Sequence, residues 1–193
     1  MSKMVIYGYR LLFLLCSMLC LNVVHAQSAD PKLLECRAEA TASEGLKVRQ
    51  AKFDFELSPR LEDLLQKSIP LYFTTEFNLK RTRRYWWDEP VINVDYSWRL
   101  NYHTLTRKYR LARNNIHYSF STLNEALALI KVVRNWTITD SLMIDKNSRY
   151  VASIRFHLDE TKLPKLLLAT PLTSVDWLLD SGWRACSLKT VGD

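Results

Sequence analysis

Glycine and proline are scarce in this chain, which has four glycines and six prolines among 193 residues. No glycines are spaced as in the phosphate-binding loops of nucleotide-binding enzymes, so those classes are excluded. No linker rich in glycine, serine and proline occurs, nor any low-complexity tract. We therefore expect one domain, over residues 35–190.

Motifs for catalysis and metal binding are also missing. No Gly-x-Ser-x-Gly elbow occurs, and His103, His117 and His157 lack the His-x-x-x-His spacing of a metal site. Acidic residues such as Asp176 and Asp180 do not belong to any recognisable catalytic motif. We expect a protein that is not an enzyme and uses no metal or other cofactor. The alternative is an envelope hydrolase with a carboxylate pair that spacing does not reveal.

Apolar residues are concentrated near the N-terminus. Lys3 and Arg10 precede the apolar run LLFLLCSMLCLNVV, and Val24-His25-Ala26 ends in a small residue suited to cleavage. The run is shorter than the roughly 20 residues that span a bilayer, so a cleaved signal peptide over 1–26 is preferred to a retained anchor. We expect a flexible lead over 27–34 and a periplasmic location.

The formal net charge is +7, and the predicted signal peptide carries Lys3 and Arg10 without an acid, leaving 7 − 2 = +5. This balance favours contact with anionic surfaces, or serves only solubility. Nucleic acid is not expected as a partner, because it is scarce outside the cytoplasm.

Cys36 and Cys186 are the cysteines that remain after cleavage. In an oxidising compartment their positions near the two ends of the domain predict a disulfide that ties the first strand to the last. Two buried free thiols are the alternative.

Alternation of apolar and polar residues predicts an α+β fold: a twisted antiparallel sheet, or a sandwich-like meander, with two to three short helices. Helix starts are indicated by Ser58-Pro59, by Thr122 with Glu125, and by Asp159. The predicted strands cover 52–57, 71–79, 91–102, 107–112, 116–120, 135–144 and 149–158.

Residues 78–98, NLKRTRRYWWDEPVINVDYSW, combine basic and aromatic residues around a turn. The register of this hairpin decides which side chains meet. A four-residue loop over 88–91 places Phe77 opposite Tyr102 and pairs apolar residues near the base, so we prefer it. A second turn over 103–106 completes a three-stranded meander.

This register places Arg81 opposite Trp98 and Arg83 opposite Tyr96. Such cation–π pairs contribute about 0.5–2 kcal/mol, and support of a protruding hairpin is their structural explanation. The functional interpretation is a cleft for an amphiphilic or anionic ligand. The predicted ligand-binding residues are Arg81, Arg83, Tyr85, Trp87, Tyr96 and Trp98.

On the opposite face, the register aligns Lys80, Arg99 and Arg110 across three adjacent strands. Like charges directly opposite one another destabilise a sheet, so this row is either screened by solvent or binds an anion. We take these three residues as a predicted anion site.

The phrases YFTTEFNLKRTRRYWWDEPV, RLNYHTLTRKYRL, STLNEALALI, RFHLDETKLPKLLL and DWLLDSGWR resemble an uncharacterised proteobacterial family of exported proteins. That family is classed as a domain of unknown function and is often labelled "proline-rich signal peptide protein". The resemblance covers nearly all of the chain after the signal segment. It implies a periplasmic accessory role, with genes near a sensor kinase of the nitrogen-regulation type, and no assigned catalytic residue.

We therefore expect a non-enzymatic periplasmic binding or accessory protein. Its expected partner is an anionic or amphiphilic envelope component, or the extracytoplasmic part of a membrane protein, with a sensor histidine kinase as one candidate. Peripheral contact with the membrane fits this expectation. Besides the hydrolase, a purely structural assembly partner is the remaining alternative.

Overall fold

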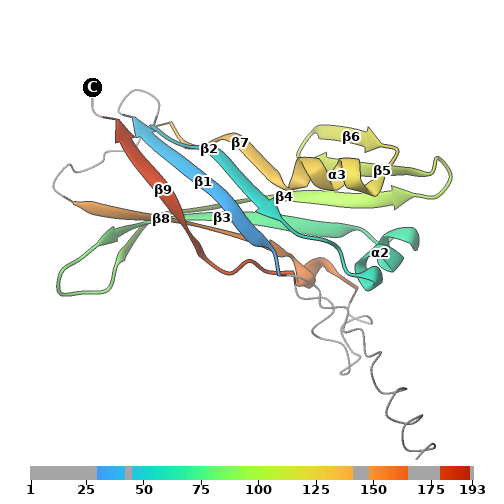
Figure 1. The fold of residues 1–193 in the computed structure, drawn as a ribbon, viewed down its shortest axis with the longest axis horizontal. Helices are drawn as coiled ribbons and strands as arrows, with labels where there is room; N and C mark the ends of the chain where they lie inside the picture. Colours follow the sequence, from blue (N-terminus) through green and yellow to red (C-terminus); the bar gives the residue numbers. More distant parts are fainter. Residues whose placement is uncertain (1–29, 42–44, 141–147, 165–178, 192–193) are drawn as a thin grey trace, which may run out of the picture.

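The computed structural model describes residues 30–41, 45–140, 148–164 and 179–191, and their strands form one curled sheet, a half-barrel (Figure 1). The strand order is β6-β5-β4-β3-β8-β9-β1-β2-β7. Neighbouring strands are antiparallel except for β1 and β9, which are parallel. The strands are β1 Lys32–Thr41, β2 Gly45–Asp54, β3 Leu71–Thr82, β4 Glu89–His103, β5 Lys108–Arg113, β6 Ile116–Phe120, β7 Val132–Thr139, β8 Arg149–Leu158 and β9 Arg184–Val191.

The core lies inside the curl. Four phenylalanine rings meet there, two from the neighbouring strands β3 and β8 and two from the end of β2 and the residues after it, with Phe156 stacked 5.1 Å from Phe53 and 4.8 Å from Phe55. Phe73 stacks on the same group, its ring centroid 6.0 Å from that of Phe156. All four side chains are almost completely buried. The curl thus buries the apolar face of the sheet, together with Leu61 and Leu65 of α2 and Ile130 of α3.

Two short helices have the predicted start signals. α2 (Pro59–Gln66) is capped by Ser58, whose hydroxyl accepts a hydrogen bond from the Leu61 N–H at 3.3 Å. α3 (Leu123–Ile130) is capped by Thr122 in the same way. At the start of the predicted third helix, 161–169, the structure has a 3-10 turn, η1 (Glu160–Lys162), and residues 165–169 of the prediction lie outside the described residues.

The register predicted for the β3–β4 hairpin is wrong. Phe77 faces Val94 rather than Tyr102, and the connecting loop is 83–88 rather than 88–91. The observed register lets β3 pair along its whole length, so that Phe73 meets Trp98. The turn between β4 and β5 also differs from the prediction: the loop is 104–107 rather than 103–106, and Leu100 faces Leu111.

The predicted disulfide is confirmed. Cys36 on β1 is bonded to Cys186 on β9, where the two strands run parallel with their Cα atoms 4.8 Å apart. A disulfide indicates an oxidising, extracytoplasmic site. The predicted signal peptide, 1–26, lies outside the described residues, and β1 begins at Lys32, within the stretch expected as a lead. Within the described chain, no helix is long and apolar enough to cross a membrane.

The disulfide closes a loop with a sequence separation of 150 residues. Replacing both cysteines, Cys36→Ser with Cys186→Ser, should lower the free energy of unfolding by roughly 3–5 kcal/mol, because the unfolded chain regains the entropy of that loop. Urea unfolding with and without reductant measures the loss. Reductant should destabilise the wild type and leave the double variant unchanged, and equal sensitivity of both proteins would contradict the prediction.

Gly45 begins β2 with a φ of +69°. A Cβ at this position would overlap the carbonyl oxygen of Thr139 and lie 2.6 Å from the carbonyl carbon of Asp140. Gly45→Ala should therefore cost roughly 2 kcal/mol or more of stability, since it adds a clash with backbone to the strain of a positive φ. Gly182→Ala is the matched control, because Gly182 also has a positive φ but open space around it. Thermal unfolding should give Gly45→Ala a clearly lower midpoint temperature than Gly182→Ala.

Candidate functional site

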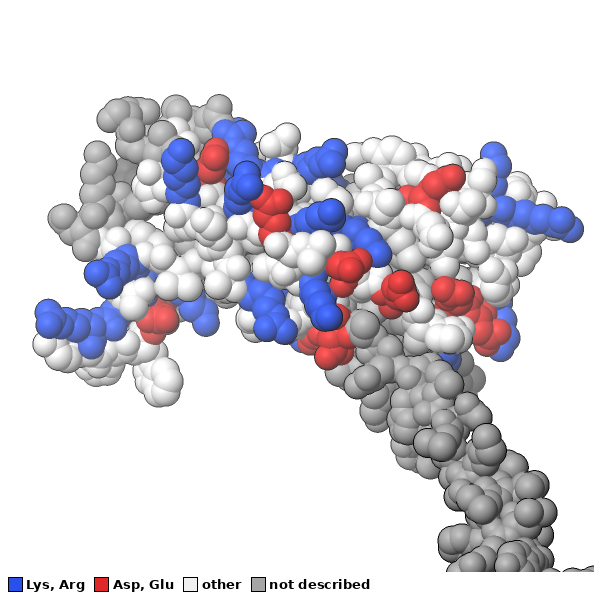
Figure 2. Space-filling model, viewed as in Figure 1, with Lys and Arg blue, Asp and Glu red and all other residues white. Residues whose placement is uncertain are grey.

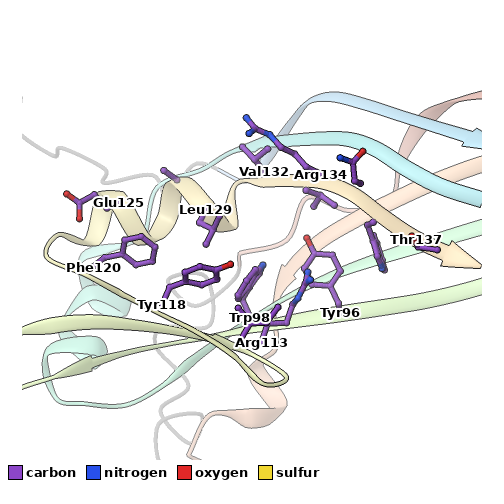
Figure 3. Close-up of a pocket in the computed structure, with 15 residues that line it drawn as sticks. Tyr96, Trp98, Arg113, Tyr118, Phe120, Glu125, Leu129, Val132, Arg134 and Thr137 are labelled. Atoms are coloured by element: carbon purple, nitrogen blue, oxygen red, sulfur yellow. The ribbon is translucent and has the colours of Figure 1, made fainter.

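A cleft of about 720 Å³ opens between the two edges of the half-barrel (Figure 3). One wall is formed by β4, β5 and β6, and the other by the edge strand β7 and by α3, the helix that connects the edge strand β6 to β7. The volume falls within the range of about 300–1,000 Å³ typical of small-molecule sites. The lining residues are Tyr96, Trp98, Arg113, Ile116, Tyr118, Phe120, Glu125, Ala128, Leu129, Val132, Val133, Arg134, Asn135, Trp136 and Thr137.

Arg113 is the central cation of the cleft. It ends β5, one residue after the pairing of Ala112 with Arg99, and therefore projects from the same face as Trp98 on the neighbouring strand. Its guanidinium carbon lies 4.7 Å from the ring centroid of Tyr96 and 4.9 Å from that of Trp98. Both distances are those of cation–π interactions, which orient the guanidinium over two aromatic faces.

Aromatic rings continue from this stack along both walls. The ring of Trp136, on the far edge strand β7, meets Tyr96 edge-on with centroids 4.6 Å apart. On the other side Trp98 is followed by Tyr118, at 6.2 Å, and Tyr118 by Phe120, also at 6.2 Å. Tyr118 is 43% exposed, so part of this aromatic surface faces the opening of the cleft.

Positive charge dominates the polar groups of the cleft. Arg113 and Arg134 are the lining cations, and Glu125 is the lining acid. The Glu125 carboxylate already accepts a hydrogen bond from the Ser121 N–H at 3.2 Å, as part of the α3 cap. The cleft thus combines apolar and aromatic walls with guanidinium groups, which are the donors best suited to carboxylate and phosphate.

The six predicted ligand-binding residues fall into two separate places. Tyr96 and Trp98 line the cleft. Arg81 and Arg83 lie near the end of the β3–β4 hairpin, where both guanidinium groups contact the Glu89 carboxylate. Arg113 therefore takes the position over the two rings that the predicted register gave to Arg81 and Arg83.

The other two predicted residues, Tyr85 and Trp87, are also on the hairpin loop and are 83% and 92% exposed. They do not line the cleft. At the base of this loop, hydrogen bonds from Arg81 and Arg83 hold the pKa of the Glu89 carboxyl below its usual value, so Glu89 stays ionised and paired.

The predicted basic row is not assembled. Arg99 pairs with Tyr72 on β3, whereas Lys80 lies eight residues further along that strand, opposite Pro90. Eight residues of strand correspond to about 26 Å. Arg99 and Arg110 are diagonal neighbours, since Arg110 pairs with Asn101. The predicted alignment of these three basic residues depended on the pairing of Phe77 with Tyr102, and it is wrong because Phe77 pairs with Val94.

Sequence reasoning missed several cleft residues: Arg113, Tyr118, Phe120, Arg134 and Trp136. The signal available for Arg113 was its alternation with Leu111 on β5, and Tyr118 faces Leu111 across the β5–β6 pairing, so all three lie on the apolar face. Trp136 had no such signal, because its place opposite Tyr96 depends on the closure of the whole sheet.

A smaller, polar hollow of about 340 Å³ lies elsewhere, lined by Thr74, Glu76, Asn93, Asp95, Ser97, His157, Asp159 and Lys162. Glu76 and Asp95 are directly opposite on β3 and β4. Glu76 also lies 3.7 Å from the His157 Nδ1 and 3.9 Å from Arg155. Across the described ranges, no group of three or more His, Cys, Asp or Glu is arranged to hold a metal ion.

The fold and the cleft define a single, mostly-β domain: a half-barrel with a ligand-sized hollow between its edges. A family profile described as a domain of unknown function, DUF4390, matches residues 36–187, so the chain belongs to the DUF4390 family. The predicted membership of a domain-of-unknown-function family is confirmed to that extent. No curated protein and no solved structure matches the chain.

Burial raises the pKa of the Tyr96 hydroxyl to about 12, against the lowering effects of the Thr75 hydrogen bond and the Arg113 charge. The unfolded chain loses this proton near pH 10 while the folded chain keeps it, so the stabilisation present below pH 10 is lost as the pH rises toward about 12. Between pH 10 and about 12, the free energy of unfolding of the wild type, measured in urea, should fall by about 2–3 kcal/mol relative to that of Tyr96→Phe.

The control for this experiment is Tyr85→Phe, which removes an exposed tyrosine. Its stability should follow the wild type at every pH. A constant difference between the wild type and Tyr96→Phe from pH 9 to about 12 would show that Tyr96 titrates normally.

Proposed function

We propose that this protein is a non-enzymatic, periplasmic binding protein whose cleft holds an anionic amphiphile of the bacterial envelope. The observation that carries the proposal is the Arg113 guanidinium, 4.7 and 4.9 Å from the Tyr96 and Trp98 rings, inside a hollow of about 720 Å³. A cation fixed among aromatic rings offers an anionic group a charged partner and its apolar neighbour a surface to pack on.

The walls of the cleft support a ligand with an apolar portion. Leu129 and Val132 come from the α3–β7 side, and Ile116 and Phe120 from the β6 side. Burial of an apolar chain between them is worth roughly 25 cal/mol per Å² before the cost of association. An anionic head group would meet Arg113, the lining cation beside the Tyr96 and Trp98 rings, whereas the Arg134 guanidinium points away from these rings (Figure 3).

The disulfide supports the location, because Cys36 and Cys186 are bonded and such bonds persist in oxidising compartments. The same chemistry admits a second kind of occupant: an acidic and apolar segment from the extracytoplasmic part of a membrane protein, such as the sensor histidine kinase that the family resemblance suggests. We favour the small amphiphile, because the hollow has the volume of a small-molecule site.

An envelope hydrolase remains the alternative function. The observation in its favour is the direct opposition of Glu76 and Asp95 in the polar hollow. Glu76, however, already lies within ion-pair distance of Arg155 and His157. The Arg155 guanidinium, which binds Asp180 more closely at 2.6 Å, offsets part of the Glu76 charge, so this arrangement supports hydrolysis less strongly than the cleft supports binding.

The test compares two dyes with similar apolar rings, the anionic 1-anilinonaphthalene-8-sulfonate and the neutral N-phenyl-1-naphthylamine. Arg113→Gln should weaken binding of the sulfonate about tenfold or more, because a charge-assisted hydrogen bond is lost, and should change binding of the neutral dye about twofold at most. Fluorescence titration gives both dissociation constants.

Arg110→Gln is the matched control, since Arg110 lies on the same strand but on the opposite face from the cleft residue Arg113. It should leave both constants unchanged. Equal effects of the two substitutions on the sulfonate would refute the proposal. Lipid analysis of the natively purified wild type and Arg113→Gln proteins then identifies the class of natural ligand, which should be depleted from the variant.

A further inference from the structure

The end of the β3–β4 hairpin carries a second surface, separate from the cleft. Three consecutive aromatic side chains on its loop, Tyr85, Trp86 and Trp87, are 83%, 78% and 92% exposed. The hairpin projects from the body of the protein at one end of the sheet (Figure 1). Aromatic rings this exposed and this close together form an apolar patch of the kind that marks an interaction surface.

Basic residues surround these rings. Residues 80–89 contain four basic residues, Lys80, Arg81, Arg83 and Arg84, and two acids, Asp88 and Glu89, for a net charge of 4 − 2 = +2. Arg149 pairs with Thr82 on the neighbouring strand and adds another positive charge. Figure 2 shows Lys and Arg gathered at this projecting end beside uncharged groups.

The internal contacts of the loop keep the rings outside. Arg84 lies over the Tyr85 ring, 5.9 Å from its centroid, and Arg83 contacts Glu89 at 2.7 Å. Glu89 is thereby occupied, and the acid at the base of the loop offers little repulsion to an anionic surface. The aromatic side chains of Trp86 and Trp87 are left facing solvent.

We propose that this hairpin end, residues 83–88, docks on the interface of an anionic phospholipid bilayer. Tryptophan and tyrosine favour the level of the lipid head groups, where an apolar ring and a polar atom are both accommodated. Arginine next to them binds lipid phosphate. A projecting loop reaches a flat surface without obstruction by the rest of the domain, as this geometry requires.

The surface is independent of the proposed cleft. Tyr96 in the cleft lies seven residues along β4 from Glu89 at the hairpin end, a distance of about 23 Å along an extended strand. None of the residues 83–88 lines the cleft. The two proposals can therefore fail separately.

The test is co-sedimentation of the full-length mature protein with vesicles of phosphatidylcholine alone or of phosphatidylcholine with phosphatidylglycerol. The wild type should sediment with the anionic vesicles, and added salt should weaken its binding. Arg83→Gln with Arg84→Gln should weaken the partition about 25-fold, because each arginine near an anionic surface contributes roughly fivefold. Tyr85→Ser with Trp86→Ser and Trp87→Ser should weaken it about tenfold or more, even at low salt.

Two controls locate the effect. Leu105→Ser removes a side chain that is 91% exposed at the turn at the other end of β4, and should leave binding unchanged. Arg113→Gln reports on the cleft instead: sedimentation lost in that variant and kept in the hairpin variants would place the lipid contact in the cleft and overturn docking by the hairpin. Quenching of tryptophan fluorescence by brominated lipid should occur in the wild type and largely disappear in the aromatic variant.

Two results would overturn the proposal. One is a wild type that stays in the supernatant with both kinds of vesicle, which would make the hairpin end a contact for a protein. The other is an aromatic variant that sediments as the wild type does, while circular dichroism shows the same fold for both.

Discussion

A single sheet with one apolar face has little to pack against except itself. Here the nine strands curl until Phe53 and Phe55, from one half of the sheet, reach Phe156 near its middle. Irregular steps in the ladder, such as those between Arg37 and Ala38 and between Leu79 and Lys80, accompany this curvature. The burial of this one face is the constraint on which the rest of the structure depends.

The curl leaves two edge strands, β6 and β7, which belong to opposite ends of the sheet and do not pair with each other. The chain passes from one to the other through α3, a helix of eight residues, or about 12 Å. Side chains rather than backbone pairing therefore fill the space between the edges. The contact of Trp136 with Tyr96 closes the deeper part, and the outer part remains as the cleft.

Local features of the fold could be predicted from the sequence. Ser58 and Thr122 cap helices, and each hydroxyl accepts a hydrogen bond from the N–H three residues later. Such a cap involves only neighbouring residues, so the sequence reveals it without knowledge of distant contacts. The β6 strand, Ile116–Phe120, was predicted with its observed bounds, and the alternation of β3 and β4 assigned their faces correctly. The cysteine pair could be predicted because compartment chemistry leaves few other roles for two thiols.

Long-range features could not be predicted in the same way. Shifting a hairpin register by an even number of residues keeps every side chain on its face, so alternation does not choose between Val94 and Tyr102 as the partner of Phe77. The parallel pairing of β1 with β9 likewise leaves no local signal. The cleft depends on both features, which is why two of its aromatic residues were predicted but its cation, Arg113, was not.

The strand β4 links the two surfaces of the molecule. Its outer end, at Glu89, forms one arm of the projecting hairpin, and its middle, at Tyr96 and Trp98, forms part of one wall of the cleft. Hydrogen bonding to β3 along nearly its whole length makes this strand a stiff connection rather than a linker. Anything that holds the hairpin end against a surface therefore also limits how far from that surface the cleft can lie, because about 23 Å of paired strand joins the two. A binding protein built this way would keep its cleft near the membrane that supplies an amphiphilic ligand.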